Sequence, residues 1–255
     1  MTVRLEVDGR GVAVLTLARG TKHNAMDEGM IADLAAAAAR LEAEDAVRVV
    51  VLAGEGESFC AGGDLAWMRA QMEGGAAARE RGARALAGML GAFWRLGRPL
   101  VARVQGAAYG GGVGLVALAD VAVAAEGTRF GLTETRLGLI PATIGPYVAA
   151  RLGPQAGRVF LSGRPFGAEE AARLGLVARI AAPEALDRAV EEEVAPFLAC
   201  APGALREAKA LLRALGPVVT EAQVEASVAA LVRRWESAEA AEGVGAFLAR
   251  RKPSW

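Results

Sequence analysis

Two glycine-rich stretches of the sequence could stabilise negative charge on an oxygen atom. YGGGVGL (Tyr109–Leu115) follows the apolar run RPLVARVQGAA, and SFCAGGDLAWM (Ser58–Met68) follows the apolar run VRVVVLAG. Backbone amides at a turn from a strand into a helix face outward and can bind an anion or a polarised oxygen. Two such donors make an oxyanion hole, in which one donor lowers a reaction barrier by about 3–4 kcal/mol in a dry site.

Glu134 is the candidate proton carrier. It stands in RFGLTETRLGLIPATIGPYVAARLG, which is otherwise apolar or neutral apart from its arginines. Partial removal of a carboxylate from water raises its pKa toward neutrality, and this suits proton transfer.

Close packing in a crowded core is the alternative interpretation of the glycines. A dinucleotide-binding turn is excluded because the stretch contains no G-x-G-x-x-G and lies far from the first βα turn.

Composition narrows the function further. The 255 residues are 53% hydrophobic and 23% charged, which is enough for one large core, and 29 basic residues balance 29 acidic ones. This balance favours neither nucleic acid nor an acidic membrane as a partner. His23 is the single histidine, which excludes histidine triads and multi-histidine metal sites, so we expect no metal. Cys60 and Cys200 lie in apolar contexts and are predicted to be buried thiols in a reducing compartment.

The N-terminus does not resemble a signal peptide, because charges interrupt its apolar runs, and no uncharged apolar run reaches about 18 residues. We therefore expect a soluble cytoplasmic protein.

β-branched runs predict strands at Gly11–Leu17, Val47–Gly54, Leu100–Gly106 and Asp120–Ala125. Helices are predicted to begin at Asp27 and to run through Ala76–Leu96. This alternation indicates an α/β fold with mainly parallel strands, followed from about residue 183 by a helical appendage without strands.

Three motifs taken together resemble the enoyl-CoA hydratase/isomerase (crotonase) superfamily: FCAGGDL, QGAAYGGGVGL and FGLTETRLGLIP. The similarity extends over nearly the whole chain, since LTLARGTKHNAM, LSGRPFGAEEAARLGLVARI and EGVGAFLARRKPSW also match family landmarks. The resemblance implies a crotonase-like spiral of ββα repeats in residues 1–195, which carries the CoA and acyl site. It also implies a C-terminal helical oligomerisation region, residues 196–255, which assembles a trimer or a dimer of trimers.

The resemblance also implies site residues and a ligand. The substrate would be an acyl-CoA thioester, and no separate cofactor is expected because coenzyme A is part of that substrate. The amides of Ala61 and Gly111 would hold the thioester oxygen, and Glu134 would move the proton. The CoA-binding residues would be Lys22, Asn24, Ala25, Ala61, Gly63, Asp64 and Leu65. The acyl pocket would be lined by Trp67, Met68, Tyr109, Gly110, Gly114 and Thr133.

One departure from the family pattern leaves the reaction open. Hydratases with two catalytic glutamates carry the first where this chain has Gly114, whereas the second corresponds to Glu134. Relatives with a single glutamate include enoyl-CoA isomerases, which move a proton between carbons. AYGGGVGL with LTETRLGLIPATIGPYV also resembles bacterial hydratases that act on methylglutaconyl-type CoA esters in branched-chain catabolism. We favour a hydratase whose water is held by another polar group, and we retain an isomerase and a non-catalytic acyl-CoA-binding homologue as alternatives.

Several other residues have both a functional and a structural interpretation. Tyr109 would line the acyl pocket or pack in the core, and Cys60 is more consistent with a small buried apolar residue than with a nucleophile. His23 would lie near the CoA nucleotide or in an exposed loop. The basic residues at 250–252 would meet CoA phosphates or form a solvated helix end.

Overall fold

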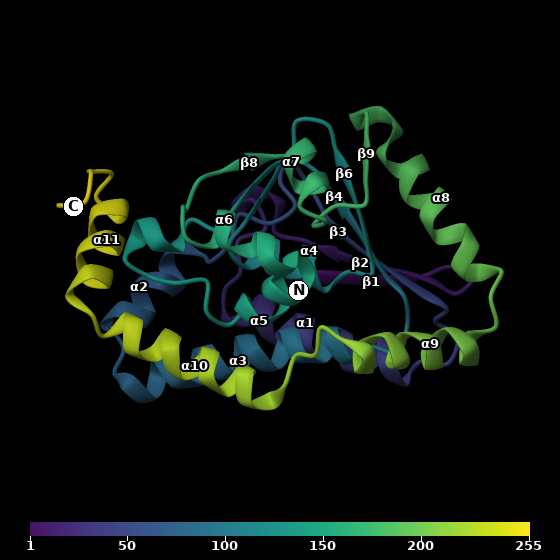
Figure 1. Ribbon diagram of the computed structural model, residues 1–255, viewed down its shortest axis with the longest axis horizontal. Helices are drawn as coiled ribbons and strands as arrows, with labels where there is room; N and C mark the ends of the chain where they lie inside the picture. The colour runs from purple at the N-terminus through teal and green to yellow at the C-terminus, as the bar shows by residue number, and fades with distance from the viewer.

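A six-stranded sheet forms the centre of the protein, in a computed structural model that describes residues 1–255 (Figure 1). Its strand order is β1-β2-β3-β4-β6-β9. β1 is antiparallel to β2, and every other neighbouring pair is parallel. The strands are β1 (Val3–Val7), β2 (Val12–Leu17), β3 (Val49–Gly54), β4 (Leu100–Val104), β6 (Val121–Ala125) and β9 (Arg179–Ala181). All four predicted strands are therefore confirmed, with ends shifted by one or two residues.

A second, smaller sheet gives the chain its spiral course. It contains β5 (Ala107–Tyr109), β7 (Arg129–Gly131) and β8 (Phe166–Gly167). β4 of the large sheet leads into β5 of the small sheet and then into α4 (Gly111–Leu118); β6 and β7 lead in the same way to α5 (Gly145–Leu152). The predicted repetition of ββα units is thus confirmed.

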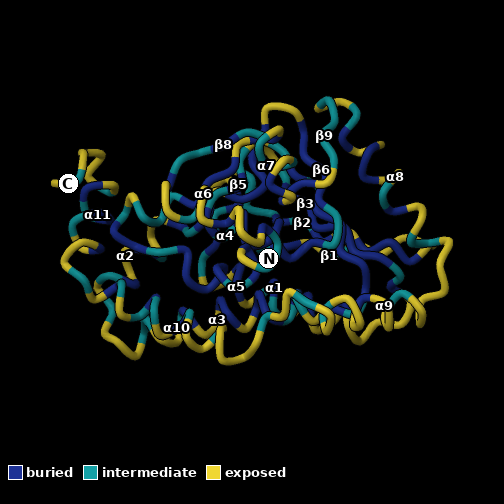
Figure 2. Tube along the Cα trace, viewed as in Figure 1, coloured by how far each residue is buried: buried dark blue, intermediate teal, exposed yellow.

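Helices cover both faces of the large sheet, as parallel strands require. On one face, α1 (Glu28–Ala43) and α3 (Ala76–Arg95) pack against each other, and on the other α8 (Leu186–Leu198) lies over β3, β4 and β6. All six side chains of β3 are buried between these layers, as Figure 2 shows by the dark strands at the centre. The predicted start of α1 is confirmed, because the Asp27 side chain accepts a hydrogen bond from Met30 N.

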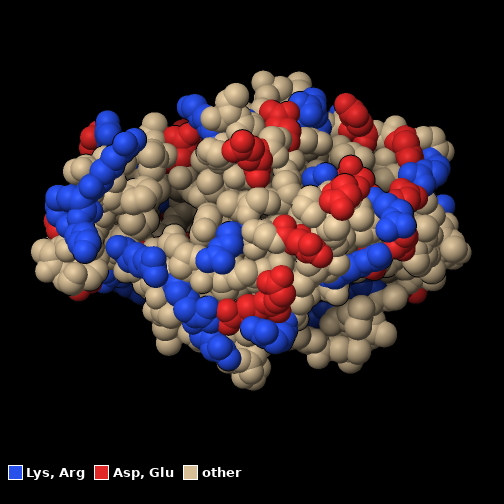
Figure 3. All heavy atoms as spheres, turned by 90° about the horizontal axis from the view of Figure 1, so that it is seen from above, with Lys and Arg blue, Asp and Glu red and all other residues tan.

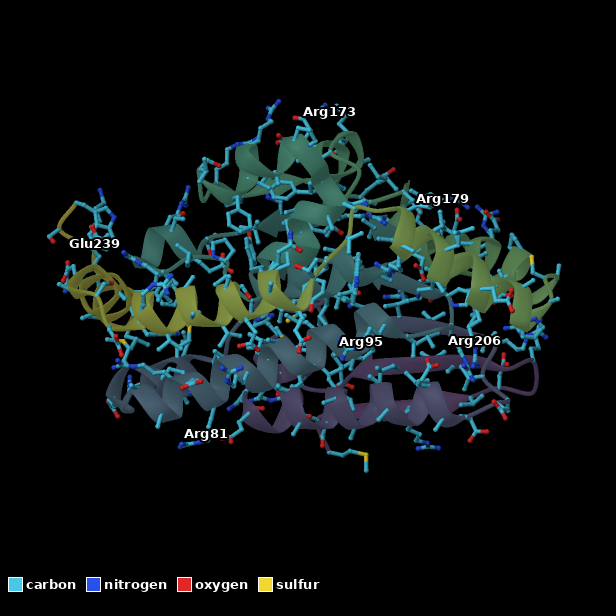
Figure 4. The ribbon with its side chains drawn as sticks, turned by 60° about the horizontal axis from the view of Figure 1, so that its bottom comes forward. Arg81, Arg95, Arg173, Arg179, Arg206 and Glu239 are labelled. Carbon is cyan, nitrogen blue, oxygen red and sulfur yellow. The ribbon has the colours of Figure 1, made fainter.

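The C-terminal part of the chain is wholly helical, as predicted. It comprises α9 (Pro202–Leu215), α10 (Glu221–Trp235) and α11 (Ala238–Leu248). α10 lies alongside α3 (Figures 1 and 4), and α11 contacts α2 (Leu65–Glu73) and the 3-10 helix η2 (Glu134–Leu137). The expected division between residues 195 and 196 falls inside α8. The remaining helices are η1 (Gly20–Lys22), η3 (Gly153–Gln155), α6 (Ala156–Phe160), α7 (Ala168–Arg173) and η4 (Pro183–Ala185).

The two cysteines differ in burial, which corrects part of the prediction from sequence. Cys60 is buried, and this burial raises the pKa of its thiol to about 12, so it is not a thiolate near neutral pH. Cys200 is exposed, because it follows the end of α8 at the surface. No helix has both the length and the apolar content needed to cross a lipid bilayer.

Candidate active site

The two glycine turns are in direct contact. Cys60 N donates a hydrogen bond to Ala107 O at 3.0 Å, and Tyr109 N donates to Cys60 O at 2.9 Å. Gly62 has φ +95°, and a Cβ on it would stand 3.1 Å from Tyr109 O. The turns after β3 and β4 therefore meet at one place, and a side chain on Gly62 would be both strained and crowded there.

Two unpaired amides lie at this junction. Gly111 is the first residue of α4, and its amide donates to no carbonyl in the protein, as is usual for the first turn of a helix. Gly62 O and Asp64 N both bond to Met26, so the Gly63 amide between them points to the other side of that segment. The Gly63 amide is also unpaired. Gly63 and Gly111 thus each have a free N–H, and both residues line one cavity.

The prediction that Ala61 supplies one of the amides is wrong. Its N–H donates to His23 O at 2.9 Å, so it is already satisfied within the protein. The sequence shows that the AGG turn is rich in small residues, but not which of its amides bonds to the loop at His23. The free amide of this turn lies two residues further along the chain, at Gly63.

Glu134 begins η2 and lies beside Gly110, the residue that precedes Gly111. Its Oε1 is 3.0 Å from the position that a Cβ on Gly110 would take, and its Oε2 is buried with no hydrogen-bond partner. Burial raises the pKa of Glu134 to about 7, only partly opposed by a hydrogen bond from its own backbone amide. A carboxyl group with this pKa can both accept and donate a proton near neutral pH.

A cavity of about 650 Å³ connects these groups. Figure 3 shows a hollow in the surface toward the end of the molecule that carries the C-terminal helices. The cavity is lined by most of the residues predicted from the sequence: Lys22, Ala25, Ala61, Gly63, Asp64, Leu65, Trp67, Met68, Tyr109, Gly110, Gly111, Thr133 and Glu134. Asn24 and Gly114 do not line it.

Asn24 has a structural role instead of the predicted ligand contact. It is fully buried, and its side-chain nitrogen donates to Glu55 O at 2.9 Å and to Ser58 O at 2.8 Å. Its side-chain oxygen accepts from Arg19 N at 2.9 Å. All the polar atoms of the side chain are thus used to hold the loop after η1 against the loop after β3.

Gly114 lies on a closely packed face of α4 and does not line the cavity. A Cβ on Gly114 would overlap Cγ2 of Ile144 and stand 2.9 Å from Ile144 Cβ. Ile144 itself lines the cavity. The space that a carboxylate side chain at position 114 would enter is therefore filled by an isoleucine.

Asp64 lines the cavity, but its carboxylate is held by the protein. Oδ1 accepts from Ala66 N at 2.9 Å and caps α2, and Oδ2 lies 3.0 Å from Arg19 Nη2. Burial alone would raise the pKa of Asp64, but the bonds from Ala66 and Arg19 outweigh it and lower the pKa. Asp64 thereby fixes the start of α2, the helix that carries Trp67 and Met68 into the cavity.

Sequence reasoning missed the contribution of the C-terminal helices. Leu231 and Trp235 of α10 and Phe247 of α11 line the same cavity, together with Leu86 of α3. The apolar spacing of Leu231 and Trp235 indicates a buried helix face but not which surface covers it. The segment before α5 adds further lining residues: Leu137, Leu139, Ile140, Pro141, Ala142, Thr143 and Ile144.

The remaining polar candidates divide between the cavity and the surface. His23 lines the cavity mouth, and its Nδ1 is 3.1 Å from Ser58 Oγ. Arg251 is paired with Glu242 at 2.7 Å, and none of residues 250–252 lines the cavity. No three His, Cys, Asp or Glu side chains come together as a metal-binding group would require.

Comparison with known proteins places this chain in a family. The family model for enoyl-CoA hydratase/isomerase matches residues 8–255. A mevalonyl-coenzyme A hydratase of Aspergillus fumigatus is 34% identical over 96% of this chain and 91% of its own. The structure of Pseudomonas aeruginosa AtuE matches with 39% identity and a TM-score of 0.81, covering 100% of this chain and 99% of its own. An enoyl-CoA hydratase from Mycobacterium avium matches with 32% identity and a TM-score of 0.88, covering 100% and 98%.

Proposed function

The chain belongs to the enoyl-CoA hydratase/isomerase family, and we propose that it adds water across the 2,3 double bond of an acyl-CoA thioester. One arrangement carries this proposal: the Glu134 carboxyl, with its raised pKa, lies beside Gly110 and lines the same cavity as Gly63 and Gly111, whose amides are free. Such an arrangement combines a proton carrier with donors for a developing negative charge.

In the proposed reaction, the thioester oxygen accepts hydrogen bonds from Gly63 and Gly111. Glu134 takes a proton from water as the oxygen of that water bonds to C3, and the π electrons of the double bond move to form an enolate. The enolate then collapses as Glu134 returns a proton to C2. The carboxyl group ends as it began, and the chemistry needs no cofactor beyond the coenzyme A of the substrate.

With a single carboxylate in the site, the attacking water lacks the hydrogen bond that a second carboxylate would provide. Hydroxyl groups that line the cavity are suited to provide it. Tyr109, Thr133 and Thr143 all line the cavity, and Thr143 is 3% exposed. We propose Thr143 as the main water-positioning group because it is adjacent to Ile144, which lies where the second carboxylate would reach. Replacement of Thr143 by valine, which keeps the shape, should lower kcat by about 10-fold with little change in KM.

An isomerase is the second candidate, and the Ile144 side chain favours it. With that space filled, the cavity is lined by two carboxyl groups, and Asp64 is held by Ala66 N and Arg19. Glu134 alone is then free to move a proton from C4 to C2 of a 3-enoyl chain without adding water. The same cavity and the same oxyanion stabilisation would serve both reactions.

Product masses separate these functions. Wild type and Glu134→Gln are incubated with 2-enoyl-CoA and 3-enoyl-CoA thioesters, and the products are identified by mass and by the position of the double bond. A hydratase yields a gain of one water, whereas an isomerase yields a shifted double bond at constant mass. If wild type binds these thioesters and converts none, the protein is a non-catalytic acyl-CoA-binding homologue and the hydratase proposal is wrong.

We also propose that the protein forms a closed homo-oligomer, a trimer or a dimer of trimers. The support lies in α9, where Leu211, Leu212 and Leu215 are between 58% and 74% exposed, and Figure 2 shows this helix on the outside of the molecule. An apolar helix face of this kind is usually covered by a partner. Sedimentation of the purified protein at micromolar concentration should show a trimer or hexamer; a monomer would contradict the proposal.

A further inference from the structure

A second cavity of about 350 Å³ lies apart from the candidate active site, with which it shares no lining residue. Trp94 of α3, Arg151 of α5, and Lys209 and Arg213 of α9 line it, together with Asp120, which lies between α4 and β6. We refer to it as the cationic cavity, because its wall holds three cations and one carboxylate.

Asp120 neutralises only part of this positive charge. Its Oδ2 accepts from Lys209 Nζ at 2.6 Å and from Leu100 N at 2.7 Å, and its Oδ1 lies 3.5 Å from Arg213 Nη2. The guanidinium of Arg151 donates to the backbone carbonyl groups that follow α4, at 3.1 and 3.3 Å, and not to the carboxylate. One negative charge thus serves three cations.

The carboxylate of Glu42 also acts on Lys209, but it lies outside the cavity wall and has a cation of its own. It is 3.7 Å from Arg98 Nη1 and accepts from Gly97 N at 2.8 Å. Glu42 therefore does not make up the missing negative charge of the cavity.

The cations of the cavity oppose one another. Burial lowers the pKa of Lys209 and of Arg213, and a neighbouring arginine lowers each of them further: Arg213 acts on Lys209, and Arg151 acts on Arg213. The attraction of Asp120 does not offset these effects. A further anion in the cavity would relieve this repulsion, since opposite charges close together favour the charged form of each group.

Arg213 has N–H groups available for such an anion. Its guanidinium stacks on the Trp94 ring, with Cζ 3.3 Å from the ring centroid, and Asp120 approaches it no closer than 3.5 Å. In addition, Nε of Arg151 is buried with no hydrogen-bond partner. A planar guanidinium held on an aromatic face has its edge free, and that edge can donate to two oxygens of one phosphate or carboxylate.

We propose that the cationic cavity binds a small free oxoanion, such as inorganic phosphate, among Arg213, Lys209 and Arg151. Lys209 is 8% exposed and the side chain of Arg213 is 23% exposed, so these cations are recessed. A recessed site suits a small ion better than a phosphate group on a large partner. The proposal does not depend on the reaction catalysed in the larger cavity.

Calorimetry with inorganic phosphate tests the proposal on the wild-type protein. In 0.15 M NaCl we expect one phosphate per chain with a Kd below about 1 mM, and weaker binding as the salt concentration rises. Phosphate should also raise the Tm, because it binds the folded chain. No heat of binding and no change in Tm at about 20 mM phosphate would overturn the proposal.

Three arginine or lysine variants locate the site. Arg213→Gln should weaken phosphate binding by at least about 10-fold. Arg206→Gln is the matched control, because it makes the same change of charge on α9 at an exposed residue outside the cavity. Lys22→Ala removes the one lysine or arginine of the larger cavity. Both controls should bind phosphate as wild type does; binding lost in Lys22→Ala and kept in Arg213→Gln would overturn the proposal.

Asp120→Asn tests the charge argument in the opposite direction. The asparagine oxygen can still accept from Leu100 N and Lys209, whereas the competing negative charge is gone, so phosphate should bind about 10-fold more tightly. Equal or weaker binding in the folded variant would contradict the proposal. If the variant does not fold, Arg213→Gln decides.

Sedimentation separates anion binding from assembly. Leu212 of α9 lines the cationic cavity and is 68% exposed, so the cavity adjoins the face that we propose for oligomerisation. If wild type binds no phosphate and Arg213→Gln instead changes the oligomeric state, the cations serve contact between copies of the chain and the proposal is wrong. Phosphate binding with the same oligomeric state in wild type and Arg213→Gln supports it.

Discussion

Ile144 Cβ lies 2.9 Å from the position that a Cβ on Gly114 would occupy, so the isoleucine side chain fills the space in front of this glycine. Ile144 belongs to the segment before α5 and is 3% exposed, whereas Gly114 is in the middle of α4. The two elements pack directly against each other. A second catalytic carboxylate at position 114 is therefore not simply absent; its place is occupied.

This packing predicts a dependence between the two positions. Gly114→Glu alone should destabilise the fold, because a buried carboxylate would be forced into Ile144. Gly114→Glu combined with Ile144→Ala should recover much of the lost stability and raise the hydration rate of crotonyl-CoA. Thermal melts and hydration assays of the two single variants and the double variant measure this. Strictly additive losses of stability would show that the residues do not compete for space.

The assignment of the amide donors predicts different effects at neighbouring residues. Gly63→Pro removes the free N–H and should lower kcat/KM by about 100-fold, the scale for losing one oxyanion donor. Gly63→Ala is the control, because its Cβ would stand 3.4 Å from Met68 Cγ in ordinary contact and the N–H would remain. Circular dichroism checks the fold of both variants. A folded proline variant with normal turnover would exclude Gly63 as a donor.

Asp64 should matter through the helix that it caps. Asp64→Ala removes the acceptor for Ala66 N and the partner of Arg19, so we expect a loss of about 1–3 kcal/mol in the free energy of unfolding and a higher KM. Asp64→Asn keeps a good helix cap and should lose less stability. Urea denaturation and steady-state kinetics measure the two effects. Direct ligand binding by Asp64 would instead raise KM equally in both variants.

The raised pKa of Glu134 predicts that ionisation of this side chain destabilises the folded protein as the pH rises. The folded chain releases this proton near pH 7, whereas the usual pKa of the side chain is 4.5, so folding favours the protonated form. The contribution of Glu134 to the free energy of unfolding is therefore lost as the pH rises from about 4.5 to about 7. Glu134→Gln should be more stable than wild type above pH 7, by at most about 3 kcal/mol, with the difference shrinking toward pH 4.5. Urea denaturation across this range would contradict the account if the difference did not vary.

The sequence predicts most of the fold because its signals are local. Apolar β-branched runs and the cap at Asp27 determine β2, β3, β4, β6 and α1 from their own residues. The three-residue strands β5 and β7 have no such signal, since they depend on pairing with distant segments. The site shows the same limit. Glu134 and Gly111 are evident from their motifs, but the difference between Ala61 and Gly63 depends on a bond to the His23 loop.

The positions of Ile144 and of the cavity residues Leu231 and Trp235 could not be predicted for a related reason. Which side chain faces Gly114 depends on how α5 packs on α4, more than twenty residues along the chain. The contribution of Leu231 and Trp235 depends on how α10 lies along α3, and no local pattern encodes this.

The central claim is that Glu134 is the proton carrier beside the two free amides of Gly63 and Gly111. The most direct test is the kcat of wild type and Glu134→Gln, measured as a function of pH on the enoyl-CoA that wild type converts fastest. We predict an ionisation near pH 7 in the wild-type profile and its loss in the variant, together with a loss of about 10²–10⁴ in kcat and unchanged binding of saturated acyl-CoA. Full activity in folded Glu134→Gln, with the same pH profile as wild type, would contradict the claim.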